Sequence, residues 1–168
     1  MKLLFYIIVY GFLGYLLERI INLIVYGFWL DNRVLYLPVQ PMYGLGVVLT
    51  LIVYRYLMKR TLPSLIKWGT LLFIAVLFTA LSEITSGLLY HYFYERLLWN
   101  YQTTFPMCYL PYVCLLPTSF FGILALFTVH YLHPYIEAFT FRLPRWLING
   151  IVVLVFIDYI LTYKEVLL

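Results

Sequence analysis

Three acidic residues stand inside long apolar runs, where a charge is costly. Glu18, Glu83 and Asp158 belong to three separate runs of mostly hydrophobic residues. A charged side chain at the centre of a membrane helix costs about 2.5–3.5 kcal/mol on insertion scales. We therefore expect these carboxylates to face protein, a cation or water. Acidic groups at such positions are candidates for binding a solute or moving a proton.

The three carboxylates are predicted to reach a similar depth. A helix rises about 1.5 Å per residue, so the basic residue that begins each run lies roughly 24 Å from Glu18, roughly 24 Å from Glu83 and roughly 20 Å from Asp158. If the basic ends are cytoplasmic, all three lie in the outer half of a membrane. The alternative left open is that buried ion pairs only fix the helix register.

Two arginines in the outer connections are the predicted partners of these carboxylates. Arg19 cannot share the direction of its neighbour Glu18 on a helix. Arg33 or Arg96, folding in from a connection, is the better cation. We expect no metal and no cofactor, because no His or Cys cluster has the spacing of a metal site. Cys108 and Cys114 can form a disulfide if both face an oxidising compartment.

The elements that position these residues are predicted to be membrane helices. The 168-residue chain is 65% hydrophobic and 11% charged, whereas soluble domains carry about 25% charged residues. The segments long enough to cross a core of roughly 30 Å are 3–29, 41–57, 66–90, 113–132 and 146–163. Because open sheets cannot satisfy their backbone in lipid, the predicted fold is all-α. It is a polytopic helical bundle in a single domain, residues 1–168, with irregular or re-entrant outer connections.

Basic residues predict the orientation of the bundle, because cytoplasmic connections carry an excess of Lys and Arg. One side has Lys2, Arg55, Lys59, Arg60, Lys67, Arg142 and Arg145, and the other has Arg33, Arg96 and Lys164. The N-terminus is therefore predicted to be cytoplasmic and the C-terminus outside.

Small and polar residues line one face of two predicted helices and are expected to pack inward. These are Gly11, Gly14, Glu18 and Asn22 in the first helix, and Thr79, Glu83, Ser86 or Gly87, and Tyr90 in the third.

Two stretches rich in proline and glycine, "PVQPMYGLG" and "CLLPTSFFG", interrupt the apolar pattern. Pro41 can open a helix, because the first turn tolerates proline, and Gly44 and Gly46 permit close approach by a neighbour. Pro117 frees a carbonyl and can kink its helix. Irregular backbone at membrane depth is tolerated where it is buried in protein or lines a wet cavity. The first stretch therefore predicts either a closely packed re-entrant turn or a cavity open to the outside.

A set of motifs spread over nearly the whole chain is similar to one known family. Its residues are Gly14, Leu17, Glu18, Asn32, Arg33, Pro38, Pro41, Tyr43, Gly44, Gly46, Glu83, Gly87, Trp99, Tyr101, Pro106, Cys114, Leu115, Ser119, Gly122 and Asp158. With these residues the chain resembles the CmpB-like, ABC-transporter type IV family of small bacterial membrane permeases. It departs from the family pattern at Val34 and Asn100, where the family has Gly and Asp, as a divergent member would.

The resemblance implies a polytopic permease-like protein of a bacterial cell (plasma) membrane. From the charged layer formed by the three carboxylates we expect an outward-facing polar cavity that binds or moves a small polar or amphipathic solute. The candidate solute-binding residues are Glu18, Arg33, Tyr43, Glu83, Arg96, Trp99, Tyr101, Ser119 and Asp158. The chain has no G-x-x-x-x-G-K-[ST] loop, so any ATPase is a separate chain. The expected partners are membrane lipids, an ATPase or other membrane subunit, or further copies of this chain. No basic tract dense enough for nucleic acid is present.

Two other functions are left open by the sequence, so whether the chain is an enzyme is undecided. An outer-leaflet enzyme acting on lipid or a lipid-linked substrate could use paired carboxylates as general acid and base, although no compelling nucleophile is evident. A structural or regulatory subunit could use the same carboxylates to specify assembly.

Overall fold

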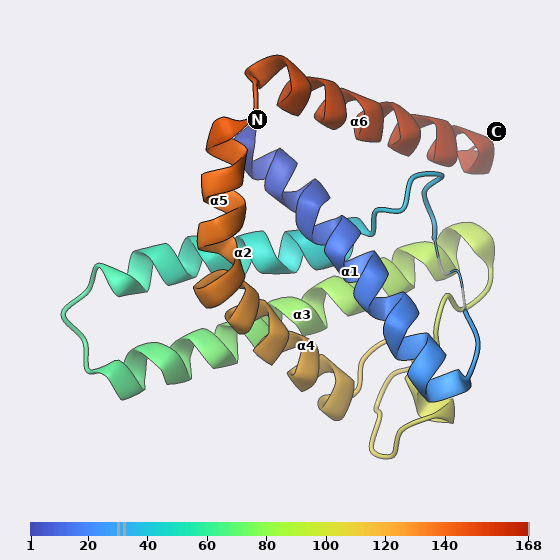
Figure 1. Cartoon of the computed structure of the whole chain (residues 1–168). Coiled ribbons are helices and arrows are strands. Elements are labelled where there is room, and N and C mark those ends of the chain that lie inside the picture. Colours follow the sequence, from blue (N-terminus) through green and yellow to red (C-terminus); the bar gives the residue numbers. More distant parts are fainter. Residues whose placement is uncertain (30, 32, 168) are drawn as a thin grey trace. The chain divides into compact units, whose positions relative to one another are not determined.

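The structure consists of helices joined by irregular connections (Figure 1). The computed structural model describes residues 1–29, 31 and 33–167, and for Tyr26 and residues 165–167 it describes the backbone alone. The helices are α1 (Lys2–Tyr26), α2 (Pro41–Met58), α3 (Ser64–Tyr94), the 3-10 helix η1 (Tyr101–Thr103), α4 (Leu115–Phe127), the π-helix η2 (Thr128–Leu132), α5 (His133–Arg142) and α6 (Arg145–Leu167). No strand occurs among the described residues, and the predicted all-α class is confirmed.

Within the described residues, five helical segments are long and apolar enough to cross a membrane, as predicted. They are Lys2–Val25, Pro41–Met58, Ser64–Tyr94, Leu115–Arg142 and Arg145–Lys164. The fourth is longer than predicted because the chain continues helically from α4 through η2 into α5. Many large apolar side chains on these helices are exposed, as expected where the outer face of a helix meets lipid.

Glycine and proline account for the helix boundaries. The first helix ends at Tyr26, before the predicted end, because Gly27 adopts the left-handed conformation (φ 78°) and donates its N–H to the Leu23 carbonyl. Pro41 opens α2 as predicted. Pro117 lies in the first turn of α4, where its missing N–H has no helical partner to lose. The predicted kink at Pro117 is therefore wrong.

The chain forms two compact units, and the first comprises Met1–Leu45 and Phe141–Leu168. In this unit α1 packs against α6 and against the start of α2. The Gln40 N–H donates to the Gly11 carbonyl at 3.2 Å. Gly44 lies so close to α1 that a Cβ there would be 1.9 Å from the Ile7 carbonyl oxygen. The predicted inward face of α1 is confirmed at its buried members, Gly11, Gly14 and Asn22.

The second unit comprises Gly46–Thr140, and in it α3 packs along α4. The contact is close because a Cβ on Gly122 would lie 2.6 Å from Val76 Cγ2. The buried residues of α3 are Leu71, Ala75, Thr79, Glu83 and Gly87. They confirm the predicted inward face at Thr79, Glu83 and Gly87, whereas Tyr90 is half-buried. That all 168 residues form a single domain stays a prediction.

Candidate functional site

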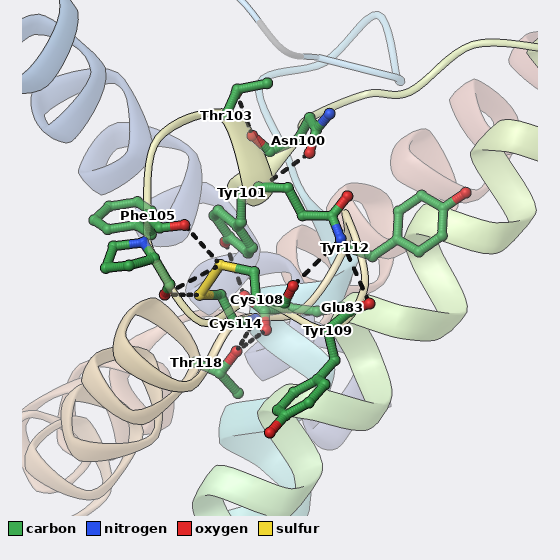
Figure 2. The surroundings of a disulfide bond; sticks show 12 residues. Glu83, Asn100, Tyr101, Thr103, Phe105, Cys108, Tyr109, Tyr112, Cys114 and Thr118 are labelled. Atoms are coloured by element: carbon green, nitrogen blue, oxygen red, sulfur yellow. Dashed lines mark hydrogen bonds between the residues drawn. A yellow bond between two sulfur atoms is a disulfide. The ribbon is translucent and has the colours of Figure 1, made fainter.

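Glu83 is a nearly fully buried carboxylate in the interior of α3, with 2% of its surface exposed. Its Oε1 accepts a hydrogen bond from the Tyr101 hydroxyl at 2.9 Å, and its Oε2 accepts one from the Thr118 hydroxyl at 2.6 Å (Figure 2). Within the described part of the chain, Glu83 takes part in no ion pair. The predicted arginine partner is therefore wrong for Glu83, and two hydroxyl donors take its place.

The connection between α3 and α4 is folded so that Tyr101 reaches this carboxylate. The Asn100 side chain caps η1 by accepting the Gln102 N–H at 3.0 Å. The Tyr101 N–H donates to the Pro111 carbonyl at 2.9 Å. A disulfide joins Cys108 to Cys114, whose Cα atoms are 4.4 Å apart (Figure 2). The sequence alone did not decide whether the two cysteines are bonded, and the structure contains the bond.

The same connection rests on α3 one helical turn beyond Glu83. Gly87 makes this contact possible, because a Cβ there would lie 2.3 Å from Cδ1 of the buried Tyr112 ring. The Trp99 indole N–H donates to the Tyr112 carbonyl at 3.0 Å. Trp99 thus holds the connection in place, and its predicted contact with a solute stays a prediction.

Thr118 is the contact of Glu83 that the sequence did not predict, since its neighbour Ser119 was chosen instead. Ser119 is half-buried, whereas Thr118 is buried against Glu83. Helical spacing carried the missing signal: Thr118 lies four residues before Gly122, so both share the face of α4 that packs on α3. Arg96, also predicted for the site, donates to the Tyr90 hydroxyl at 3.2 Å and lies over that ring.

In the first unit, Glu18 is half-buried and accepts a hydrogen bond from the Tyr43 hydroxyl at 3.1 Å. Gly14, one turn earlier on α1, leaves room for the tyrosine, because a Cβ there would lie 2.5 Å from Tyr43 Cβ. The structure therefore brings together two of the predicted site residues, Glu18 and Tyr43. That Glu18 and Glu83 share one site stays a prediction, because they belong to different units.

Asp158 of α6 is buried and binds backbone amides. It accepts the Tyr36 N–H at 3.1 Å and the Leu37 N–H at 2.8 Å, and the Thr162 hydroxyl adds a third donor at 3.3 Å. The partners of the Asp158 carboxylate are therefore backbone amides, whereas an arginine partner was predicted. Asp158 therefore fixes the connection that leads into α2 (Pro41–Met58), and its carboxylate oxygens are used for this purpose.

Arg33 forms a two-pronged ion pair with Asp31, through Nε to Oδ1 at 2.9 Å and Nη2 to Oδ2 at 2.8 Å. Arg19 joins the same carboxylate at 3.1 Å. An open depression of about 410 Å³ lies here, lined by Asp31, Arg33, Val34, Leu35 and Tyr36. Asn32, one of the residues of the family resemblance, lies outside the described residues.

The Asp31 ion pairs are expected to weaken in acid. Burial favours the neutral carboxyl and raises its pKa, but hydrogen bonds and charge from Arg33, with the charge of Arg19, outweigh burial and hold the pKa of Asp31 below its ordinary value of 3.8. A carboxyl with a lowered pKa stabilises the fold above its unfolded pKa and loses that effect as the pH falls through the folded value. The wild-type protein should therefore have a higher melting temperature than the Asp31→Asn variant at neutral pH. The difference between the two melting temperatures should shrink below about pH 4. A difference that grows in acid would contradict the ion pairs.

The carboxylates of Glu18, Glu83 and Asp158 accept hydrogen bonds from neutral hydroxyl or amide donors. Among the described residues, no group of three or more His, Cys, Asp or Glu could hold a metal ion. Glu83 with Tyr101 and Thr118 offers a buried, oxygen-rich cluster. Such a cluster can bind a polar or cationic group through the carboxylate, or exchange a proton with it.

Comparison with known proteins assigns the chain to a family. A family model described as Putative ABC-transporter type IV matches residues 5–163, which include Glu18, Glu83 and Asp158. No curated protein and no solved structure gives a significant match. Together with five helices able to span a membrane within the described residues, the match confirms the resemblance read from the motifs. The chain is a membrane protein that belongs to the family described as Putative ABC-transporter type IV.

Proposed function

We propose that the chain is a permease-like membrane subunit that binds a small polar or amphipathic solute from the outer side, with Glu83 as a ligand. The observation that carries this proposal is the setting of Glu83: a buried carboxylate within an apolar helix, held by two hydroxyls, with no ion pair among the described residues. A leucine at this position would pack in lipid or protein at no electrostatic cost. Retaining an acidic group there makes sense if a ligand uses it.

The outer side is supported by two independent features. Disulfides such as Cys108–Cys114 persist in oxidising compartments outside the cytoplasm. The excess of Lys and Arg belongs to the opposite helix ends, which the positive-inside rule assigns to the cytoplasm. We therefore propose that the N-terminus lies inside and the C-terminus outside. That the membrane is a bacterial plasma membrane is proposed from the family resemblance alone.

Partner chains complete the proposal. The chain has no phosphate-binding loop of the G-x-x-x-x-G-K-[ST] kind, so ATP-driven transport would require a separate ATPase. Lipids, another membrane subunit or further copies of this chain are the other proposed partners. The enzyme alternative requires Glu18 and Glu83 in one site, which stays a prediction.

The test is native mass spectrometry of protein gently extracted from cell membranes. Wild-type protein is compared with Glu83→Gln and with Glu95→Gln, a matched control that removes a charge at an exposed position just beyond α3. Wild-type and Glu95→Gln should carry the same small bound species. Glu83→Gln should lose it about tenfold or more, because a hydrogen bond to a charged group contributes about 1.5–3 kcal/mol.

Two results would count against the proposal. One is the same bound species at equal occupancy in all three proteins, which would place the ligand elsewhere. The other is no bound small molecule in any of them, including samples that retain partner chains, which would favour a purely structural role for Glu83.

A further inference from the structure

We propose that the Cys108–Cys114 disulfide is a positioning element of the Glu83 site, holding the loop that supports Tyr101 on one side and Thr118 on the other, whose hydroxyls contact the carboxylate. The inference rests on the proposed function, in that Glu83 is taken as the solute-binding group. Figure 2 shows the disulfide beside the residues that surround Glu83. Two chains of contacts lead from the two cysteines to the two hydroxyls.

The first chain of contacts runs from Cys114 through Thr118. Cys114 is buried and caps α4. Its backbone N–H donates to Thr118 Oγ1 at 3.3 Å, and its carbonyl accepts the Thr118 N–H at 3.0 Å. The Thr118 hydroxyl then donates to Glu83 at 2.6 Å. The position of Cys114 therefore sets the direction of the hydroxyl that contacts Glu83 Oε2.

The second chain of contacts runs from Cys108 to Tyr101. The Gln102 side-chain N–H₂ group donates to the Cys108 carbonyl at 3.3 Å and the Tyr109 carbonyl at 3.4 Å. The Tyr101 N–H donates to the Pro111 carbonyl, which lies inside the loop closed by the disulfide. The loop thus supports the segment whose Tyr101 hydroxyl reaches Glu83 Oε1.

The centre of the loop has anchors of its own. The Tyr112 ring packs on Gly87, and Trp99 donates to the Tyr112 carbonyl. These contacts do not involve sulfur, so breaking the disulfide leaves the loop docked on α3 (Ser64–Tyr94) while its two ends gain freedom. The effect of reduction is therefore expected at Glu83 and not across the whole unit.

Reduction makes the proposal testable with defined chemistry. A dithiol reductant supplies two electrons and two protons, the Cys108–Cys114 S–S bond breaks to give two thiols, and the reductant becomes a disulfide. Alkylation of both thiols then prevents the bond from re-forming. A Cys108→Ser/Cys114→Ser variant reaches the same state without reductant.

The readout is the rate at which a hydrophobic carbodiimide labels individual carboxyl groups, followed by peptide mass spectrometry. In the oxidised protein, hydrogen bonds from Tyr101 and Thr118 protect Glu83. Labelling of Glu83 should rise roughly tenfold or more in the reduced protein and in the double-serine variant, as expected for losing one or two hydrogen bonds to a charged group. Glu137, a half-exposed carboxylate of the same unit, serves as the internal control and should not change.

Two variants of the oxidised protein separate positioning from general stability. Thr118→Val should raise the labelling of Glu83 while the disulfide stays intact, because the hydroxyl donor is gone. Thr118→Ser keeps that donor and should restore protection.

Three results would overturn the proposal. The first is equal labelling of Glu83 with and without the disulfide. The second is a parallel rise at Glu83 and Glu137, which would assign the disulfide to overall stability. The third is alkylation of Cys108 and Cys114 without prior reduction, which would show free thiols. None of these results depends on a bound solute, so a failure here differs from a failure of Glu83→Gln to change solute binding.

Discussion

Replacing Gly44 with alanine is expected to destabilise the protein by about 3 kcal/mol, because overpacking against backbone cannot be relieved by a side-chain rotation. The added Cβ would lie 1.9 Å from the Ile7 carbonyl oxygen and 2.7 Å from its carbonyl carbon. Relief requires α1 (Lys2–Tyr26) to move away from the start of α2 (Pro41–Met58). That movement would also strain the hydrogen bond from the Gln40 N–H to the Gly11 carbonyl.

The control for this prediction lies two residues further along α2. A Cβ on Gly46 would meet nothing closer than the Ser82 hydroxyl oxygen at 4.0 Å. Gly46→Ala should therefore be neutral or should stabilise the helix by about 0.5–1 kcal/mol, the ordinary gain from removing a helical glycine. Unfolding followed by circular dichroism in detergent gives both values. Equal destabilisation by the two substitutions would contradict the observed approach of α1 to α2 at Gly44.

Gly44 and Gly46 also show which structural feature could not be predicted from the sequence. Apolar runs of membrane-spanning length determine the helices almost by themselves, because lipid leaves the backbone few alternatives. The sequence therefore predicted all five spans, but it assigned close approach to Gly44 and Gly46 alike. Residues two apart point to different sides of a helix, so the distinction depends on which side meets a neighbour, and that is a tertiary property.

The carboxylates of the candidate site were predictable from the sequence, but only two of their partners, Tyr43 and Tyr101, were among the predicted residues. Glu83 and Asp158 stand out because acidic residues are costly in apolar segments, and the structure buries both. Their donors are remote in sequence: Thr118 lies 35 residues from Glu83, and Tyr36 lies 122 residues from Asp158. Tyr36 lies in an irregular connection, about which hydrophobic periodicity carries no information. Thr118 lies in α4 (Leu115–Phe127), where only its helical spacing from Gly122 indicated that it faces α3.

The ion pairs of the arginines were also not predictable from the sequence. Arg33 was expected to fold toward a buried carboxylate, yet it pairs with Asp31 two residues earlier in the chain. In a helix such close neighbours point apart, whereas the irregular connection after α1 turns both side chains together. A local ion pair costs less chain ordering than a remote one, so nearby Asp31 is the favoured partner once the helix ends at Tyr26.

Removing the Asp158 carboxylate is expected to be about as damaging as the Gly44 substitution. In Asp158→Ala, the Tyr36 and Leu37 N–H groups lose a charged acceptor at 3.1 Å and 2.8 Å. Hydrogen bonds to charged groups contribute about 1.5–3 kcal/mol each, so a loss of about 3 kcal/mol in unfolding free energy is expected. The loss should be local first, because these amides belong to an irregular connection with few other backbone partners.

Hydrogen exchange resolves whether that local effect occurs. Peptides covering residues 34–40 should exchange roughly 100-fold faster in Asp158→Ala, since about 2.7 kcal/mol of local stability corresponds to that factor. Asp158→Asn keeps one acceptor oxygen and should give an intermediate rate. Thr162→Val removes only the hydroxyl that donates to Asp158 at 3.3 Å and should change exchange least. The order Ala, Asn, then Thr162→Val follows from the number of backbone amides left without an acceptor, whereas faster exchange in α6 (Arg145–Leu167) alone would show that Asp158 supports its own helix and not the connection.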